Sequence, residues 1–187
     1  GYFQGYSRGH MLASEDRQCS ASANKQTFFM TNMHPQFERF NGYDSQGDYV
    51  WLNAEKLARS LYQNWNSNDN GLDTIYVVKG GTIDKQEHIL GYTSNNNSSK
   101  IIVPRYFYMA ILYRHANLKT GENWKAIALW IPHTEGDTTS GTNIARQYAI
   151  SIDELEEKTN IDFFHNLPDY IENNVENSYS LNDWNWK

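Results

Sequence analysis

An arginine and a histidine lie two residues apart near the start of the chain, in the segment GYSRGHML (residues 5–12). Histidine is the side chain best suited to accept a proton near neutral pH, and an arginine guanidinium binds anions. If this segment is a strand, Arg8 and His10 point to the same face. Gly9 between them lets a ligand or another part of the backbone approach closely. The pair is compatible with acid–base chemistry on an anionic substrate. By itself it is weak evidence, because most histidines are surface or packed residues without a catalytic role.

Two further groups of polar residues follow along the chain. Asn32 and Asn41 lie nine residues apart in TNMHPQFERFN (31–41), and the Pro-Gln dipeptide between them predicts a turn. Glu55 and Arg59 are spaced i and i+4, so they share one face of a helix. By itself this second pair is best interpreted as an ion pair on a helix surface, worth a few tenths of a kcal/mol.

The helices and strands that must position these residues can be predicted from the periodicity of apolar residues and from the turn-forming residues between them. Leu57, Leu61 and Trp65 recur at helical spacing. The pattern predicts a helix over WLNAEKLARSLYQNW (51–65) and strands over TFFMTNM (27–33), DTIYVVKGGTI (73–83, buried and closed by a Gly-Gly turn), KIIVPRYFYMAILYR (100–114, interrupted at Pro104) and WKAIALWIP (124–132).

Polar loops are predicted at 94–100 and 133–143, and a second helix begins near residue 152. Ser151 and Glu154 have the spacing of a capping box, which marks a helix N-terminus. Strands and helices do not alternate as a βαβ fold requires. The sequence therefore predicts an α+β domain built on a largely antiparallel sheet.

Composition limits the class of protein. The 187 residues suit one domain, and no apolar run approaches the roughly 18 residues of a membrane span. The net charge is −6, but residues 151–187 carry nine acids and two lysines, which leaves thirteen acids and fourteen bases in residues 1–150. A phosphate-binding surface on that first part is compatible with this charge. The single cysteine, Cys19, excludes a disulfide within this chain and is expected to be a half-buried free thiol.

Several spaced motifs resemble those of the DNA/RNA non-specific endonucleases, the ββα-metal nucleases that include sugar-non-specific secreted nucleases and endonuclease G. The motifs are RGHM…A…DR (8–17), NKQTFFMTNMHPQ…FN (24–41) and W…E…R (51–59), and later segments such as IYVVKGG and ALWIP are also similar. The resemblance covers nearly the whole chain. It implies one nuclease domain over residues 1–187, with the ββα-metal fold and a mainly antiparallel sheet flanked by helices.

The resemblance also implies the catalytic roles. His10 would be the general base that deprotonates the attacking water. Arg8 and Arg59 would bind the phosphate and the charge that builds on it in the transition state. Asn32 would support the same site through hydrogen bonds.

A metal is implied at two further residues. Asn41 would be the one direct protein ligand of a hydrated Mg²⁺, a cation that prefers oxygen ligands and keeps its waters. Mn²⁺ would be able to substitute for it. Glu55 would hold a metal-bound water.

The implied activity is hydrolysis of DNA and RNA to 5′-phosphate products. Contacts confined to phosphate and metal carry no base information, so low sequence specificity is expected. DNA and RNA are the expected partners, and the resemblance leaves open a homodimer and an N-terminal segment supplied as a separate chain. Relatives also imply secretion or a periplasmic location, although the first thirty residues contain no signal peptide.

Three features depart from the family pattern. Ser7 stands where an Asp is usual, so a carboxylate that would tune the site is missing. Nine residues, GYDSQGDYV (42–50), separate Asn41 from Trp51 where three or four are usual, so Asp44 or Asp48 could reach the metal. The chain also begins seven residues before Arg8, without the strands that usually precede this motif.

Two other classes of protein remain as alternatives. Ser7 favours a weakly active or inactive nucleic-acid-binding protein on the same scaffold. The six Trp and thirteen Tyr residues, together with SLNDWNWK (180–187), are compatible with a carbohydrate-binding module.

Overall fold

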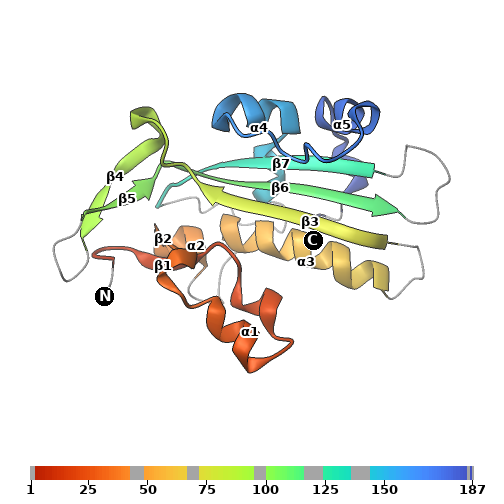
Figure 1. Ribbon diagram of the computed structural model, residues 1–187. Coiled ribbons are helices and arrows are strands. Elements are labelled where there is room, and N and C mark those ends of the chain that lie inside the picture. Colours follow the sequence, from red (N-terminus) through yellow and green to blue (C-terminus); the bar gives the residue numbers. More distant parts are fainter. Residues whose placement is uncertain are drawn as a thin grey trace.

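The computed structural model describes residues 3–42, 49–66, 72–94, 100–115, 124–135, 144–184 and 186, with side chains at all of these except 63–66, 72, 73, 115 and 144. A four-stranded antiparallel sheet lies at its centre, in the order β3 (Leu72–Gly81), β6 (Tyr106–His115), β7 (Trp124–Pro132) and β8 (Ala149–Ile150). Helix α3 (Val50–Asn66) covers one face, and α4 (Ile152–Thr159) and α5 (Asp169–Glu176) cover the other (Figure 1). The predicted α+β class and antiparallel sheet are confirmed.

Two apolar cores lie on opposite faces of this sheet because successive strand residues point to opposite sides. Phe107, Met109 and Ile111 of β6 pack in the same cluster as Trp51 and Leu61 of α3. The alternate β6 residues Ala110 and Leu112 join the other cluster, together with residues of α4 and α5: Ile152, Leu155, Ile171 and Val175.

The predicted helix over 51–65 is α3, and the predicted strands on either side of Pro104 are β5 (Lys100–Pro104) and β6. The predicted strand over 124–132 is β7. Helix α4 begins at Ile152 as the capping box predicts: the Glu154 backbone N–H donates to Ser151 Oγ over 3.1 Å, and the Ser151 N–H donates to the Glu154 carboxylate.

Smaller elements surround this framework (Figure 1). Two short sheets flank it, β1 (Ser7–His10) with β2 (Met33–Gln36) and β4 (Ile89–Ser94) with β5. Among the described residues, the other helices and 3₁₀ turns are η1 (Ser14–Arg17), α1 (Ala21–Gln26), η2 (Met30–Asn32), α2 (Glu38–Asn41), η3 (Gln86–His88), η5 (Ile144–Tyr148) and η6 (Leu181–Asp183).

The strand predicted over 27–33 is wrong. Residues 30–32 form the turn η2, and strand β2 begins only at Met33, so that Pro35 and Gln36 end a strand instead of making the predicted turn. Phe28 and Phe29 are each 55% exposed, so this apolar run has no buried face to hold it as a strand. Hydrogen bonds of Asn32, described below, fix the turn instead.

Strand β3 is also less buried than predicted. It is an edge strand, paired only with β6 in the described part of the chain, and Tyr76, Val77 and Val78 are exposed. Cys19 is exposed rather than half-buried. The predicted loop over 94–100 lies mostly outside the described residues, as does most of that over 133–143.

The C-terminal aromatic residues belong to the core. Trp184 is buried in the cluster under α3, and Trp186 packs against that cluster while its indole N–H donates to the Leu181 carbonyl. Because these rings are used in packing, they do not offer the exposed platform that a carbohydrate-binding module needs. Among the described residues, no helix is long and apolar enough to cross a membrane.

Candidate active site

Strand β1 presents the Arg8–His10 pair, as predicted from the spacing. It runs antiparallel to β2, with Gly9 opposite His34 and His10 opposite Met33. Gly9 is buried, and a Cβ at this position would lie 2.0 Å from Oε1 of Gln36, a fully buried side chain. Glycine is therefore required because the Gln36 side chain occupies the space on that face of the strand.

His10 is half-buried, with its ring edge-on to Phe28 at 5.1 Å between centroids. Its Nε2 is buried and has no hydrogen-bond partner in the described part of the chain. Burial lowers the pKa of His10; a hydrogen bond to the Arg8 backbone opposes this shift and the charge of Lys79 adds to it. A neutral imidazole with a free ring nitrogen is the state that a general base requires.

Asn32 braces the segment that follows His10. Its Oδ1 accepts from the Leu12 N–H over 2.9 Å, and its Nδ2 donates to the carbonyls of Leu12 and Thr27 at 2.9 and 2.8 Å. The Met11 N–H also donates to the Asn32 carbonyl. Asn32 therefore uses its amide to hold backbone in place, and it does so from the turn that replaced the predicted strand.

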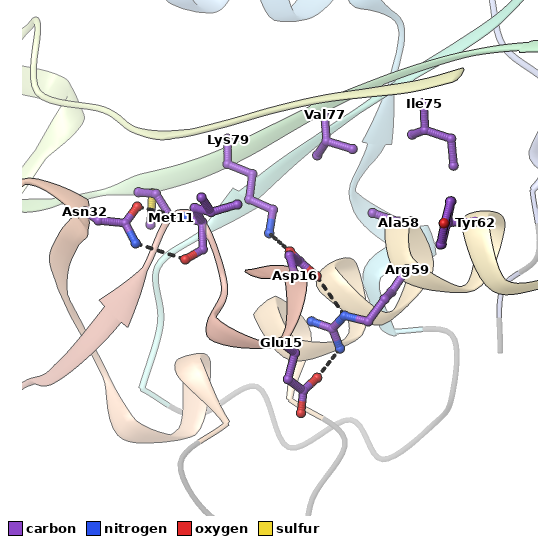
Figure 2. A pocket seen from close by; sticks show the side chains of 11 residues that line it. Met11, Glu15, Asp16, Asn32, Ala58, Arg59, Tyr62, Ile75, Val77 and Lys79 are labelled. Carbon is purple, nitrogen blue, oxygen red and sulfur yellow. Dashed lines mark hydrogen bonds and ion pairs between the residues drawn. The ribbon is translucent and has the colours of Figure 1, made fainter. Parts of the chain in front are cut away.

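A chain of ion pairs crosses from α3 to β3 (Figure 2). Lys79 Nζ on β3 lies 3.2 Å from Glu55 Oε1 on α3 and 3.5 Å from Asp16 Oδ2 on η1. Arg59 Nε lies 2.9 Å from Asp16 Oδ1, and the same guanidinium contacts Glu15. Glu55 and Arg59 thus bind these partners, and the helix-surface pair between them that the spacing suggested is not formed.

Glu55 is the most buried carboxylate in this network. Burial raises its pKa, and the Lys79 ammonium partly offsets that shift. Lys79 is itself only 8% exposed in its side chain. A carboxylate in this setting depends on nearby positive charge to remain ionised.

A cavity of about 660 Å³ lies between β3, α3 and the segment that follows β1 (Figure 2). Alternate residues of β3 form one wall, Ile75, Val77 and Lys79, because they share a face of the strand. The remaining wall comes from α3, the segment after β1, and Asn32: Ala58, Arg59, Tyr62, Met11, Leu12, Glu15 and Asp16. Apolar walls and a few charged groups are the usual make-up of a small-ligand or substrate site.

The structure brings four of the six predicted site residues around one region. Asn32 and Arg59 line the cavity, and Glu55 is joined to it through Lys79. His10 is close enough for the Lys79 charge to affect its pKa, and its carbonyl accepts from the Trp51 indole at the start of α3.

The other two predicted residues, Arg8 and Asn41, do not line this cavity. Arg8 is exposed on β1, and Asn41 is the last residue of α2, an element that contacts both α3 and β1. In the described part of the chain, no hydrogen bond joins the Asn41 side chain to Glu55 or His10. Asp44 and Asp48, which the sequence left open as residues able to reach the metal, lie outside the described residues.

Ser7 has a definite place in this arrangement. It faces Gln36 across β1 and β2, and its hydroxyl donates to the Gln36 carbonyl over 3.0 Å. A carboxylate could not donate this bond. The serine therefore fastens the first rung of the strand pair that presents Arg8 and His10.

Lys79 and Asp16 were not singled out from the sequence. Lys79 is 63 residues from Asp16 and 24 from Glu55, so no spacing rule links them. The one available signal was a lysine inside the apolar run IYVVKGG, where an inward-pointing charge needs a partner.

Comparison of the sequence with known protein families identifies the family of this chain. The model of the family described as DNA/RNA non-specific endonuclease matches residues 2–170. The chain belongs to this family. The family predicted from the resemblance is thereby confirmed.

Individual proteins similar to this chain are also named as nucleases. The chain is 28% identical over 169 residues to "Mitochondrial nuclease" of Saccharomyces cerevisiae, covering 89% of this chain and 49% of that protein. It is also 28% identical to "Nuclease" of Nostoc sp., covering 92% and 55%. The chain thus spans about half the length of the curated relatives it matches.

A solved structure shows the same fold. The structure described as the EndoG/EndoGI complex matches with a TM-score of 0.62 at 19% identity, over 88% of this chain and 61% of that chain. At this identity the match supports the architecture, which agrees with the predicted ββα-metal nuclease fold.

Proposed function

We propose that this domain is a sugar-non-specific endonuclease that hydrolyses phosphodiester bonds of DNA and RNA and leaves 5′-phosphate ends. The observation that carries the proposal is His10: a half-buried imidazole with a lowered pKa and an unpartnered Nε2, beside a cavity that Arg59 and Asn32 line. Family membership supplies the class of substrate, and the site supplies a base of suitable state.

In this proposal, His10 Nε2 takes a proton from the water that attacks the phosphorus, which requires that substrate binding opens this buried nitrogen to that water. The ring can do so because burial keeps it neutral, and the Arg8 backbone bond orients it. Arg8 lies on the same strand two residues away and offers a guanidinium to the phosphate. Asn32 keeps the backbone after His10 fixed, so the base does not have to be positioned anew for each substrate.

Arg59 has a more constrained role. Its guanidinium is held by Asp16 and Glu15, so we propose that it contributes positive charge to the phosphate from a fixed position. Asp16 bonds both Arg59 and Lys79 and therefore sets the spacing of two cations at the cavity. Charge arranged in advance stabilises a transition state without reorganisation during the reaction.

The residues assigned to a metal fit a hard cation, because Asn41 and Glu55 both offer oxygen. The buried Glu55 carboxylate has Lys79 as its cationic neighbour in this structure, and a cation is therefore what this position accepts. When bound, Mg²⁺ would supply Lewis-acid stabilisation of the phosphate oxygens and of the leaving 3′-oxygen. Mn²⁺ is expected to substitute for it.

The test is digestion of closed circular DNA and of RNA in millimolar Mg²⁺, with and without EDTA. We expect nicking of the DNA and cleavage of the RNA that EDTA abolishes, and a loss of about 10²- to 10⁴-fold in His10→Ala. His165→Ala, an exposed histidine between α4 and α5, is the matched control and should cut normally. Failure of the wild-type chain to nick DNA would refute the activity.

Binding of nucleic acid without cleavage would favour the alternative raised by Ser7, a nucleic-acid-binding protein on this scaffold. If cleavage occurs but His10→Ala cuts at the wild-type rate, the assignment of the base is wrong even though the activity stands. Secretion remains a proposal from resemblance, and five relatives carry the word mitochondrial in their names.

A further inference from the structure

Three carboxylates from two helices lie together on the side of the sheet opposite the candidate active site. Asp153 and Glu156 are on α4, one turn apart, and Glu176 is the last residue of α5. One carboxylate oxygen from each lies within 4.8 Å of the others. Figure 1 shows both helices on the face of the sheet away from α3.

A second observation sets this group apart from an ordinary acidic surface. Glu176 is only 5% exposed, and its Oε1 is buried without a hydrogen-bond partner among the described residues. A buried carboxylate oxygen left unpaired is costly, since it loses its water and gains nothing in return. One oxygen of this buried carboxylate lies in the space shared with Asp153 and Glu156.

The surroundings increase that cost. Glu172 and Asp162 also lie near enough to act on Glu176 electrostatically, together with Asp153 and Glu156, and burial and these charges raise the pKa of Glu176 to about 8. In the described part of the chain, no salt bridge joins any of the five to a lysine or arginine. Glu176 also lies at the C-terminal end of α5, where the helix dipole favours positive charge.

We propose that Asp153, Glu156 and Glu176 bind a divalent cation, with Ca²⁺ preferred, which joins α4 to α5. Oxygens are the ligands of Ca²⁺, at about 2.3–2.6 Å, so two ligands of one ion can be up to about 5 Å apart and the triad lies within that reach. Ca²⁺ also accepts irregular geometry, which suits ligands from two helices, whereas Mg²⁺ demands a near-ideal octahedron.

The consequence is structural rather than catalytic. Helices α4 and α5 are each eight residues long and cover the core that contains Ala110, Leu112 and Ala128. An ion held by both would stabilise the folded state by its binding free energy. The site is independent of the proposed nuclease chemistry, because none of its residues lines the cavity at β3.

The test is thermal unfolding of the full chain in an Asn41→Ala background, so that the metal proposed for the active site does not contribute. We expect Tm to rise by about 5 °C or more in millimolar Ca²⁺ relative to EDTA, and less in Mg²⁺. Glu176→Gln and Asp153→Asn should each abolish the rise. Glu157→Gln, an exposed carboxylate on α4 outside the triad, is the matched control and should keep it.

Glu176→Gln carries a second expectation that separates metal binding from simple packing. In EDTA it should melt close to its parent or above it, because a neutral amide replaces a carboxyl whose negative charge is disfavoured by burial and by its acidic neighbours. In Ca²⁺ the parent should melt at the higher temperature. Calorimetric titration should find one Ca²⁺ per chain in the parent and none in Glu176→Gln. The proposal is overturned if Ca²⁺ leaves the Tm of the parent unchanged, or if Glu176→Gln keeps the full rise. An equal or larger rise in Mg²⁺ overturns the preference for Ca²⁺.

Discussion

At the scale of single residues, the candidate site depends on two side chains whose pKa values are shifted in opposite directions by burial. The pKa of His10 is lowered and that of Glu55 is raised. Lys79 connects the two, because its charge lowers the first and limits the rise of the second. Groups shifted in this manner cluster at functional sites, and here Lys79, which acts on both, lines the cavity.

The pH dependence of cleavage follows from His10. The base must be neutral, and its pKa lies below the ordinary 6.5, so activity should be retained as the pH falls to 6.5 and be lost only below that value. The measurement is kcat/KM for DNA cleavage against pH at saturating Mg²⁺. An acid limb with its midpoint above 6.5 would contradict the role of a desolvated His10.

Lys79 can be tested through the same profile. Lys79→Met removes the positive charge that lowers the pKa of His10 and offsets the burial of Glu55, so both pKa values should rise and the acid limb should move to higher pH. We expect about tenfold lower kcat/KM near pH 6 and partial recovery at alkaline pH. Lys85→Met, an exposed lysine after β3, is the control. A uniform loss at every pH would instead indicate a role for Lys79 in binding.

At the scale of elements, the important unit is the β1–β2 pair, which is held by contacts that a sequence alone does not reveal. The Ser7 hydroxyl bonds the Gln36 carbonyl at one end of the pair, and the Asn32 amide bonds the backbone beyond the other end. The Gln36 side chain fills the space next to Gly9. Each strand of the pair has only four residues, so the pair depends on these side-chain contacts more than on the backbone hydrogen bonds between its strands.

Gly9→Ala should therefore destabilise the domain. The new methyl group would meet the Gln36 side chain, which is fully buried and has little room to move, and we expect a cost of about 1–3 kcal/mol. Gln36→Ala added to Gly9→Ala should recover part of this cost, as chemical denaturation of the single and double variants would measure. Gly91→Ala on β4, where a Cβ meets nothing within 4 Å, should be close to neutral. Equal stability of Gly9→Ala and Gly91→Ala would contradict this account.

The elements also show what sequence patterns can and cannot predict. Helix α3 and strands β6 and β7 were predicted because long periodic segments are decided by their own apolar pattern. The run 27–33 has strand-forming residues but folds as a turn, because Asn32 bonds Leu12 and Thr27. Likewise, the ion pairs of Lys79 with Glu55 and Asp16 exist only because the fold brings β3, α3 and η1 together. Tertiary contacts of this kind leave no trace in local spacing.

At the scale of the whole molecule, the central sheet separates the two candidate sites. The face under α3 carries the candidate active site, and the face under α4 and α5 carries the acidic triad. His133, just after β7, joins distant parts on the active-site side. Its Nε2 accepts from the Phe37 N–H over 2.8 Å, and its Nδ1 lies 2.9 Å from the Pro104 carbonyl.

This histidine predicts how the stability of the domain changes with pH. Burial lowers the pKa of His133 to about 4, from 6.5 when exposed, and only the neutral ring can accept from Phe37. Between these two values the unfolded chain binds the proton and the folded chain does not. The contribution of His133 to stability is therefore complete above pH 6.5 and falls as the pH drops toward 4, by up to about 3 kcal/mol.

The measurement is the free energy of unfolding by denaturant from pH 4 to 7, in the wild type and in His133→Gln, whose amide can both donate and accept in the ring's place. Carboxylates titrate in both proteins, so the difference between the two curves isolates His133. We expect a shallower loss of stability in His133→Gln as the pH falls, because the variant has no proton to bind. Parallel curves would mean that His133 titrates alike in the folded and unfolded chains. The contacts of His133 with Phe37, just after β2, and with Pro104, at the end of β5, would then not depend on a neutral ring.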